Sequence, residues 1–166
     1  MTKLPSLKDY TGQTMDGLLA LYGQVTTFSI VFAVERALNL KFGYDKSEEL
    51  TPKERTLLAV QGIEREVMNG GFDQFFTNSS VEYAPVVVAA LEEIDCPKTP
   101  NLAQQAIDTL QLPEVTVEAI EARMQTEDEA REDTLNALDQ EFFKYEERLD
   151  EKLFAYIRAN KDCIRV

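Results

Sequence analysis

The sequence predicts an all-α protein, a compact single-domain bundle of about six or seven helices with a long acidic C-terminal helix. Apolar residues recur at three- and four-residue spacing over long stretches, and capping signals precede several of these stretches. No run alternates apolar and polar residues for long enough to indicate a sheet. With 166 residues and 44% apolar content, the chain suits one folded domain spanning residues 1–166.

The first helix is predicted to begin after Thr14, which can cap it, and to run to about Leu40. The polar stretch 41–50 indicates a connection. The buried positions of this helix are expected to be Leu18, Leu21, Val25, Phe28, Phe32 and Val34.

A capping box begins the second helix. Thr51 can accept a hydrogen bond from the amide of Glu54, whose carboxylate can reach back, and Pro52 occupies a position whose N–H is not needed. The helix is predicted to end near residue 68, because the Asn-Gly-Gly sequence at 69–71 tolerates the left-handed conformation that ends helices. An aromatic turn is expected to follow.

Three short helices are predicted next. Pro85 is expected in the first turn of a helix ending at Ile94, and Thr99 and Pro100 begin another, which ends near Leu110. A further short helix is expected between residues 113 and 124.

The long C-terminal helix is predicted to begin at a second capping box, Thr126-Glu127-Asp128-Glu129, and to run to about Asn160. Its apolar residues form one stripe at helical spacing. The stripe consists of Leu135, Leu138, Phe142, Tyr145, Leu149, Leu153, Tyr156 and Ile157.

The absence of histidine excludes Ser–His and Cys–His nucleophile pairs and imidazole acid–base catalysis. Cys96 and Cys163 lie 67 residues apart without a C-x-x-C, so two reduced thiols are expected. An enzyme would have to use carboxylates with Mg²⁺, or Ser or Tyr with Lys, and no compact helical ligand set is visible. We therefore expect no enzyme, no catalytic residue, no metal and no cofactor.

The sequence also predicts a cytoplasmic protein. The apolar runs, such as 30–34, are far shorter than the ~20 residues that a bilayer requires, and residues 1–10 lack the apolar stretch of a signal peptide. The net charge of −13 opposes direct binding to nucleic acid or to a membrane. A charged partner should therefore be basic.

Most of the negative charge lies in the acidic segment 114–151, whose net charge is −10. Residues 127–151 carry net −8 over roughly 37 Å of predicted helix, one charge per ~4.6 Å, which approaches the ~3.4 Å of one DNA strand. Glu132, Asp139 and Glu146 are expected on one line of that helix. An acidic helix face is more often simply a solvated face that keeps a protein soluble, and this alternative stays open.

An imitation of duplex DNA would need a second acidic edge. The candidates are two groups of carboxylates, Glu114, Glu118 and Glu121 or Glu92, Glu93 and Asp95.

A dense motif occupies the centre of the chain, EREVMNGGFDQFFTNSS at 64–80, followed by Tyr-Ala-Pro at 83–85. It resembles the motif of a family of bacterial acidic helical domains, long of unknown function, whose characterised member is a DNA-mimic protein. The match is dense over about residues 51–95, and the string N-G-G-F-x-Q-F-F is fairly specific. The resemblance implies a compact all-α domain with a DNA-like surface that keeps a helix-turn-helix repressor off its operator.

Inside this motif, Phe72, Phe75 and Phe76 are expected to be core residues. The polar residues Gln74, Asn78 and Ser79 are expected to satisfy backbone groups of a turn, with a small ligand pocket as the alternative. Glu64 and Glu66 cannot face one side of a helix, and this makes them a poor catalytic pair.

The resemblance and the clustered acids predict a DNA mimic that binds the DNA-binding surface of a helix-turn-helix transcriptional repressor and relieves repression. The alternative is an acidic immunity protein or antitoxin that neutralises a basic toxin or nuclease. The sequence does not distinguish a monomer from a homodimer. The predicted contact residues are eight carboxylates: Glu127, Asp128, Glu132, Asp133, Asp139, Glu146, Glu147 and Asp150.

Overall fold

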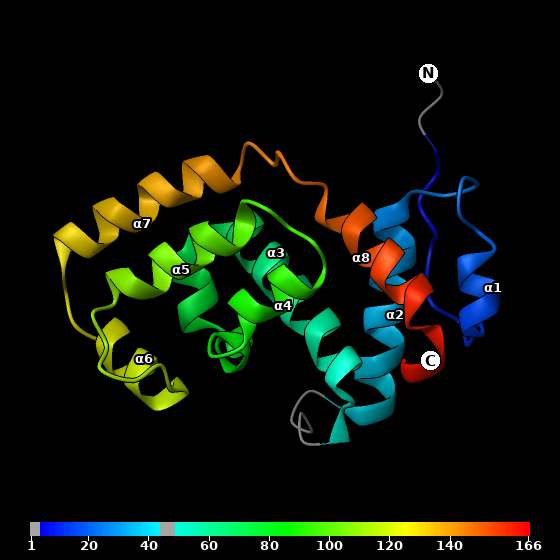
Figure 1. The fold of residues 1–166 in the computed structure, drawn as a ribbon, viewed down its shortest axis with the longest axis horizontal. Helices are drawn as coiled ribbons and strands as arrows, with labels where there is room; N and C mark the ends of the chain where they lie inside the picture. Colours follow the sequence, from blue (N-terminus) through cyan, green and yellow to red (C-terminus); the bar gives the residue numbers. More distant parts are fainter. Residues whose placement is uncertain (1–3, 44–48) are drawn as a thin grey trace. The chain divides into compact units, whose positions relative to one another are not determined.

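The computed structural model describes residues 4–43 and 49–166, and within these residues it contains helices and no strand. The predicted all-α class is confirmed. None of the described helices combines the length and apolar composition needed to cross a membrane. The helices are α1 (Met15–Leu19), α2 (Thr27–Phe42), α3 (Pro52–Thr77), α4 (Val87–Glu93), α5 (Thr99–Thr109), α6 (Val117–Met124), α7 (Glu129–Phe142) and α8 (Leu149–Ala159), with short 3-10 helices η2 (Ser79–Tyr83) and η3 (Lys161–Cys163) (Figure 1).

The chain folds as two compact units. Unit 1 consists of Met1–Leu58 and Leu149–Val166, and unit 2 consists of Ala59–Arg148. Helix α3 contributes its first residues to unit 1 and the rest to unit 2. The single domain expected over residues 1–166 stays a prediction.

In unit 1, α2 packs against α1 and α8. The predicted helix 14–40 is wrong as one element, because the chain turns between α1 and α2 through Gly23, whose φ is +78°. Because α2 begins as a new helix at Thr27, its buried face includes Ile30, Val34 and Leu38. Phe28 therefore lies on the outside with 52% of its surface exposed, contrary to the prediction.

The capping box at the start of α3 is confirmed. The amide of Glu54 donates to Thr51 Oγ1 at 3.2 Å, and the Glu54 carboxylate accepts from the amide of Thr51 at 2.8 Å. The Glu54 side chain is fully buried and also accepts from Arg165 Nη2 at 2.6 Å. Unit 1 therefore ties its C-terminal residues to the first turn of α3.

In unit 2, α5 packs against α4 and α7 (Figure 1). Helix α6 contacts η2. Three phenylalanines of the central motif are almost completely buried, as predicted. The ring of Phe72 meets that of Phe142 edge-on, with 5.8 Å between centroids. The central motif thus supplies the core against which α7 packs.

The predicted helix end at Gly70 and Gly71 is confirmed as a break, because both residues have non-helical backbone angles, but the chain resumes as helix at Phe72 and does not form the predicted aromatic turn. Gly71 has a φ of +78°, and a Cβ built on it would lie 2.1 Å from Asp139 Oδ2. The amide of Phe72 donates to Asp139 Oδ1 at 2.7 Å. A carboxylate of α7 therefore caps the resumed helix, which explains why this position requires glycine.

The predicted long C-terminal helix is wrong. It is divided into α7 and α8, which belong to different units, with Tyr145 at a φ of +46° between them. Tertiary contacts hold this break open: the Tyr145 hydroxyl binds the buried Glu64 carboxylate, and Glu147 accepts from the amide of Thr99 at 2.9 Å. The predicted apolar stripe is accordingly two separate stripes.

The second predicted capping box is also wrong. The residue that caps α7 is Asp128, whose carboxylate accepts from the amide of Arg131 at 3.0 Å. Thr126 Oγ1 donates instead to the carbonyl of Arg123 at 2.7 Å. Two of the short helices follow the prediction, with α5 beginning at Thr99 and α6 ending at Met124, whereas α4 begins at Val87, so Pro85 lies in the turn before this helix and not in its first turn as predicted.

Candidate functional site

The excess negative charge of the chain lies entirely in unit 2. Unit 2 contains 20 Asp and Glu against 6 Lys and Arg, a net charge of −14. Unit 1 contains 10 Asp and Glu against 11 Lys and Arg, a net charge of +1. The partition by folding unit is therefore sharper than the partition along the sequence.

Basic side chains of unit 2 are engaged with oxygen atoms of the same unit. Lys144 Nζ lies 2.5 Å from Glu141 Oε2, and Lys98 pairs with Glu146. Arg123 pairs with Asp128, and the buried Arg131 donates to backbone carbonyls. These cations neutralise some carboxylates locally and leave others exposed at the surface.

A group of exposed carboxylates lies on α6 and around the start of α7. We name this group the acidic corner. It consists of Glu118, Glu121, Glu127, Glu129, Glu132 and Asp133.

Part of the acidic corner also stabilises the helices. Glu118 lies in the first turn of α6, and Glu129 and Glu132 lie in that of α7, where negative charge interacts favourably with the helix dipole. Glu121 and Asp133 lie beyond these first turns, where this favourable term fades. Helix stability therefore accounts for only part of the cluster.

Of the eight predicted contact residues, four are exposed: Glu127, Glu132, Asp133 and Glu146. Glu146 lies after the end of α7, so the predicted line of carboxylates is broken.

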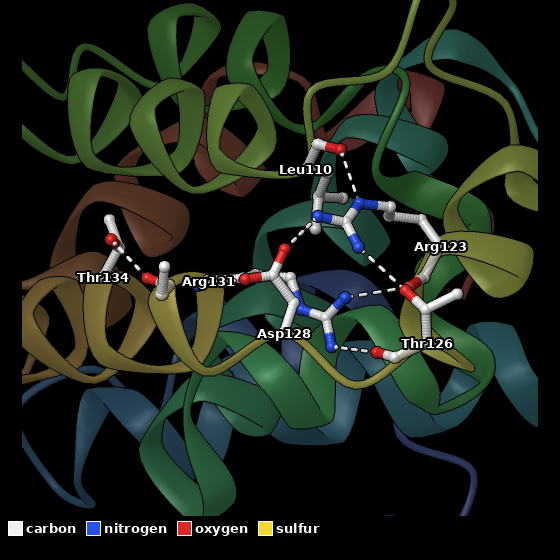
Figure 2. Close-up of polar contacts among 7 residues, drawn as sticks. Leu110, Arg123, Thr126, Asp128, Arg131 and Thr134 are labelled. Atoms are coloured by element: carbon white, nitrogen blue, oxygen red, sulfur yellow. Dashed lines mark hydrogen bonds and ion pairs between the residues drawn. The ribbon is translucent and has the colours of Figure 1, made fainter.

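Two of the eight, Asp128 and Glu147, are half-buried and serve the fold as helix caps. Asp128 caps α7 and binds Arg123, whose guanidinium lowers the pKa of Asp128 below its usual value (Figure 2). Glu147 accepts from the amide of Lys98 at 2.7 Å and from Thr99 at the start of α5. Both carboxylates are therefore already occupied by donors of the protein.

The remaining two residues, Asp139 and Asp150, are buried, with 7% and 4% of their surface exposed. The prediction that they form an exposed contact surface is wrong. The helical pattern placed them opposite the apolar stripe of one long helix, and that helix does not exist. Burial raises the pKa of Asp139, and the charge of Asp73 adds to this effect, against a lowering by the Phe72 amide.

A buried carboxylate that the sequence did not reveal organises the central motif. Glu66 Oε2 accepts from Gln74 Nε2 and from Asn78 Nδ2, both at 2.8 Å, and Glu66 Oε1 accepts from Ser80 Oγ at 3.1 Å. Burial opposes its ionisation, but these three donors and nearby Arg65 hold the pKa of Glu66 below its usual value. The amides of the motif thus bind a side chain and not the turn backbone that was predicted.

Two hollows lie on unit 2, and neither collects paired reactive groups. One, of about 330 Å³ between α4 and α5, includes Glu92 and Cys96. The other, of about 400 Å³ between the end of α3 and α6, includes Glu121 and Met124. Among the residues that the structure describes, no cluster of three or more potential ligands is placed to hold a metal ion.

The sequence model of the family described as DMP19-like protein matches residues 48–160, which are 113 of the 166 residues. The matched range contains the central motif and all of unit 2. No curated protein and no solved structure matches the chain.

Proposed function

The chain belongs to the DMP19-like protein family, and from this premise we propose that it is a DNA mimic. Its acidic corner occupies the DNA-binding surface of a helix-turn-helix transcriptional repressor, blocks operator binding and so relieves repression. The observation that carries this proposal is the confinement of the negative charge to unit 2, at net −14, beside a unit 1 of net +1.

The chemistry of such a contact is that of phosphate recognition. Proteins that read DNA bind phosphates through Lys, Arg and helix N-termini, and carboxylates can occupy the same donors. Carboxylates three or four residues apart on a helix have Cβ atoms ~5–6 Å apart. Glu129, Glu132 and Asp133, near the start of α7, therefore fall within reach of one basic surface.

The exposed carboxylates lie on α6 and around the start of α7, whereas the sequence suggested one line of carboxylates along a single long helix. The charge spacing of one long helix no longer applies, because α7 ends at Phe142. Instead, α6 and α7 contribute exposed carboxylates from two helices that follow each other closely in the chain. Glu118 and Glu121, which the sequence suggested as part of a second acidic edge, are the carboxylates that α6 contributes.

The experiment is a pull-down from the source lysate at low salt, eluted with a salt gradient and then repeated in the presence of the operator DNA of the captured protein. We expect one helix-turn-helix protein, released over a narrow salt range, because ionic contacts are screened by salt. The operator DNA should displace it. Recovery of a toxin or nuclease, or of no basic protein at all, would contradict the proposal.

A further inference from the structure

We propose that Arg123 is a positioning residue, whose guanidinium fixes the geometry of the acidic corner. The inference rests on the proposed function, because it assumes that a folded basic partner reads the arrangement of these carboxylates. Two arginines in the most acidic part of the chain need an explanation, since a surface that acts through negative charge alone gains nothing from them.

The guanidinium of Arg123 joins three separate elements (Figure 2). Its Nε donates to the carbonyl of Leu110 after α5 at 3.1 Å, and its Nη1 donates to Thr126 Oγ1 at 2.8 Å. Its Nη2 binds the carboxylate of Asp128, the N-cap of α7. The last turn of α6 is thereby tied to the end of α5 and to the start of α7.

Arg131 completes the arrangement from the other side (Figure 2). Its side chain is buried, with Nη1 donating to the carbonyl of Arg123 and Nη2 donating to that of Thr126, both at 2.8 Å. The amide of the same residue donates to Asp128. Arg123 thus binds the residue that caps α7, and Arg131 binds backbone carbonyls of Arg123 and Thr126. Together the two side chains fix the connection between α6 and α7.

The carboxylates of the acidic corner are interleaved with these contacts. Glu127 and Glu129 are the chain neighbours of Asp128, and Glu132 follows Arg131. Backbone that is held at Asp128 and Arg131 also holds the Cα positions of these neighbours. The two arginines point inward: the side chain of Arg123 is 23% exposed, and Arg131 as a whole is 4% exposed.

The direction in which a mutation changes the affinity for a basic partner distinguishes a positioning role of Arg123 from an effect of net charge alone. Replacing Arg123 by Gln makes the chain more negative by one charge, so an account based on charge alone predicts tighter binding to a basic partner. An account based on geometry predicts weaker binding, because the corner loses its shape. Lys144 offers the matched control, since Lys144→Gln removes the same charge from the same unit at an exposed ion pair with Glu141.

The experiment measures the affinity of Arg123→Gln, Arg123→Lys and Lys144→Gln for the helix-turn-helix protein recovered by the pull-down and for a flexible polylysine peptide. We expect Arg123→Gln to bind the folded protein at least 10-fold more weakly and polylysine no more weakly than wild type does. Arg123→Lys, which cannot make all three hydrogen bonds, should bind the folded protein nearly as weakly. Lys144→Gln should bind both at least as tightly as wild type. Equal affinity of Arg123→Gln and Lys144→Gln for the folded protein would overturn the proposal.

Hydrogen exchange of the free protein tests the same inference without any partner. We expect the amides of residues 125–132 to exchange at least 10-fold faster in Arg123→Gln than in Lys144→Gln, with protection of the remaining α7 amides unchanged. Unchanged protection at 125–132 would overturn the positioning role. Absence of a repressor from the pull-down would instead contradict only the proposed function.

A milder variant covers the case in which Arg123→Gln does not fold. Thr126→Val removes the hydroxyl that accepts from Arg123 Nη1 and leaves the net charge unchanged. We expect roughly threefold faster exchange at residues 127–132 for this variant, because the same hydroxyl also donates to the carbonyl of Arg123, so two hydrogen bonds of this connection are lost. Wild-type exchange there would contradict the inference.

Discussion

Units 1 and 2 are both helical, but they use charged residues in opposite ways. Unit 1 has a net charge of +1, and its ion pairs join distant parts of the chain, as in Lys161–Asp16 and Arg165–Glu54. Unit 2 has a net charge of −14, and its acidic corner is open to solvent. Because unit 1 is built from helices without excess charge, helix packing by itself does not require the acidity of unit 2. This difference supports a partner as the reason for that acidity.

The largest expected effect comes from reversing charge in one unit and not in the other. The triple variant Glu127→Lys, Glu132→Lys and Asp133→Lys should bind the captured repressor about 100-fold more weakly or worse, because like charges then face each other across the contact. Its control carries the same change of charge on three exposed carboxylates of unit 1, Asp9, Asp16 and Asp162; because Asp16→Lys also breaks the ion pair with Lys161, urea unfolding first checks that the control is folded. We expect the control to lose less than about 10-fold, through long-range attraction alone. Equal losses, measured by calorimetry, would contradict the assignment of the contact to unit 2.

A second comparison concerns two glycines with the same φ of +78°, one in each unit. Gly71→Ala should destabilise the protein by about 3 kcal/mol or more, because the new Cβ meets the Asp139 carboxylate as well as a strained backbone. Gly23→Ala meets nothing within 4 Å and should cost about 1 kcal/mol from the backbone alone. Urea unfolding of both variants measures the difference, and similar losses would mean that Asp139 does not hold the kink.

Low pH should weaken the ion pair between Glu54 and Arg165 in unit 1. Burial opposes ionisation of Glu54, but the hydrogen bonds from Arg165 and the Thr51 amide hold its pKa below the usual 4.5. A lowered pKa in the folded state contributes stability that is present above the unfolded pKa and is lost as the pH falls through the folded pKa. Glu54→Gln should therefore cost about 2 kcal/mol at pH 7, and this cost should shrink below pH 4.5. A cost that stays constant with pH in urea unfolding would refute this origin.

The smallest effect is expected on the outer face of α2. Phe32→Ser should change the free energy of unfolding by no more than about 0.5 kcal/mol, because 45% of the residue's surface is exposed. Val34→Ala, two residues further and fully buried, should cost about 2 kcal/mol. The reverse order in urea unfolding would contradict the exposed position of Phe32 on α2.

Local signals in the sequence predicted the parts of the fold that depend on neighbouring residues. The capping box of Thr51 and Glu54 depends on contacts within three residues, and the start of α5 is marked in the sequence by Pro100 in its first turn; both are as predicted. Burial of Phe72 follows from its size and apolar character. These predictions needed no knowledge of distant contacts.

The wrong predictions share a cause, which is tertiary contact. The long C-terminal helix is interrupted where Tyr145 reaches Glu64 and Glu147 caps α5, both more than 40 residues away in the chain. No periodicity within residues 126–160 carries that information. Asp139 was wrongly predicted to be exposed for the same reason, because its hydrogen-bond partner, the amide of Phe72, is distant in the sequence. Charge along the sequence locates the acidic segment, but contacts with distant residues decide which of its carboxylates are buried, as Asp139 is.

The most direct test of the central claim is a competition measured by fluorescence anisotropy. Labelled operator DNA bound to the captured repressor is titrated with the wild-type protein at low and at physiological salt. We predict that the protein releases the DNA in a saturable manner and that its inhibition constant rises steeply with salt. Displacement that is absent at low salt, or that the triple Lys variant achieves equally well, would contradict the claim that unit 2 imitates DNA.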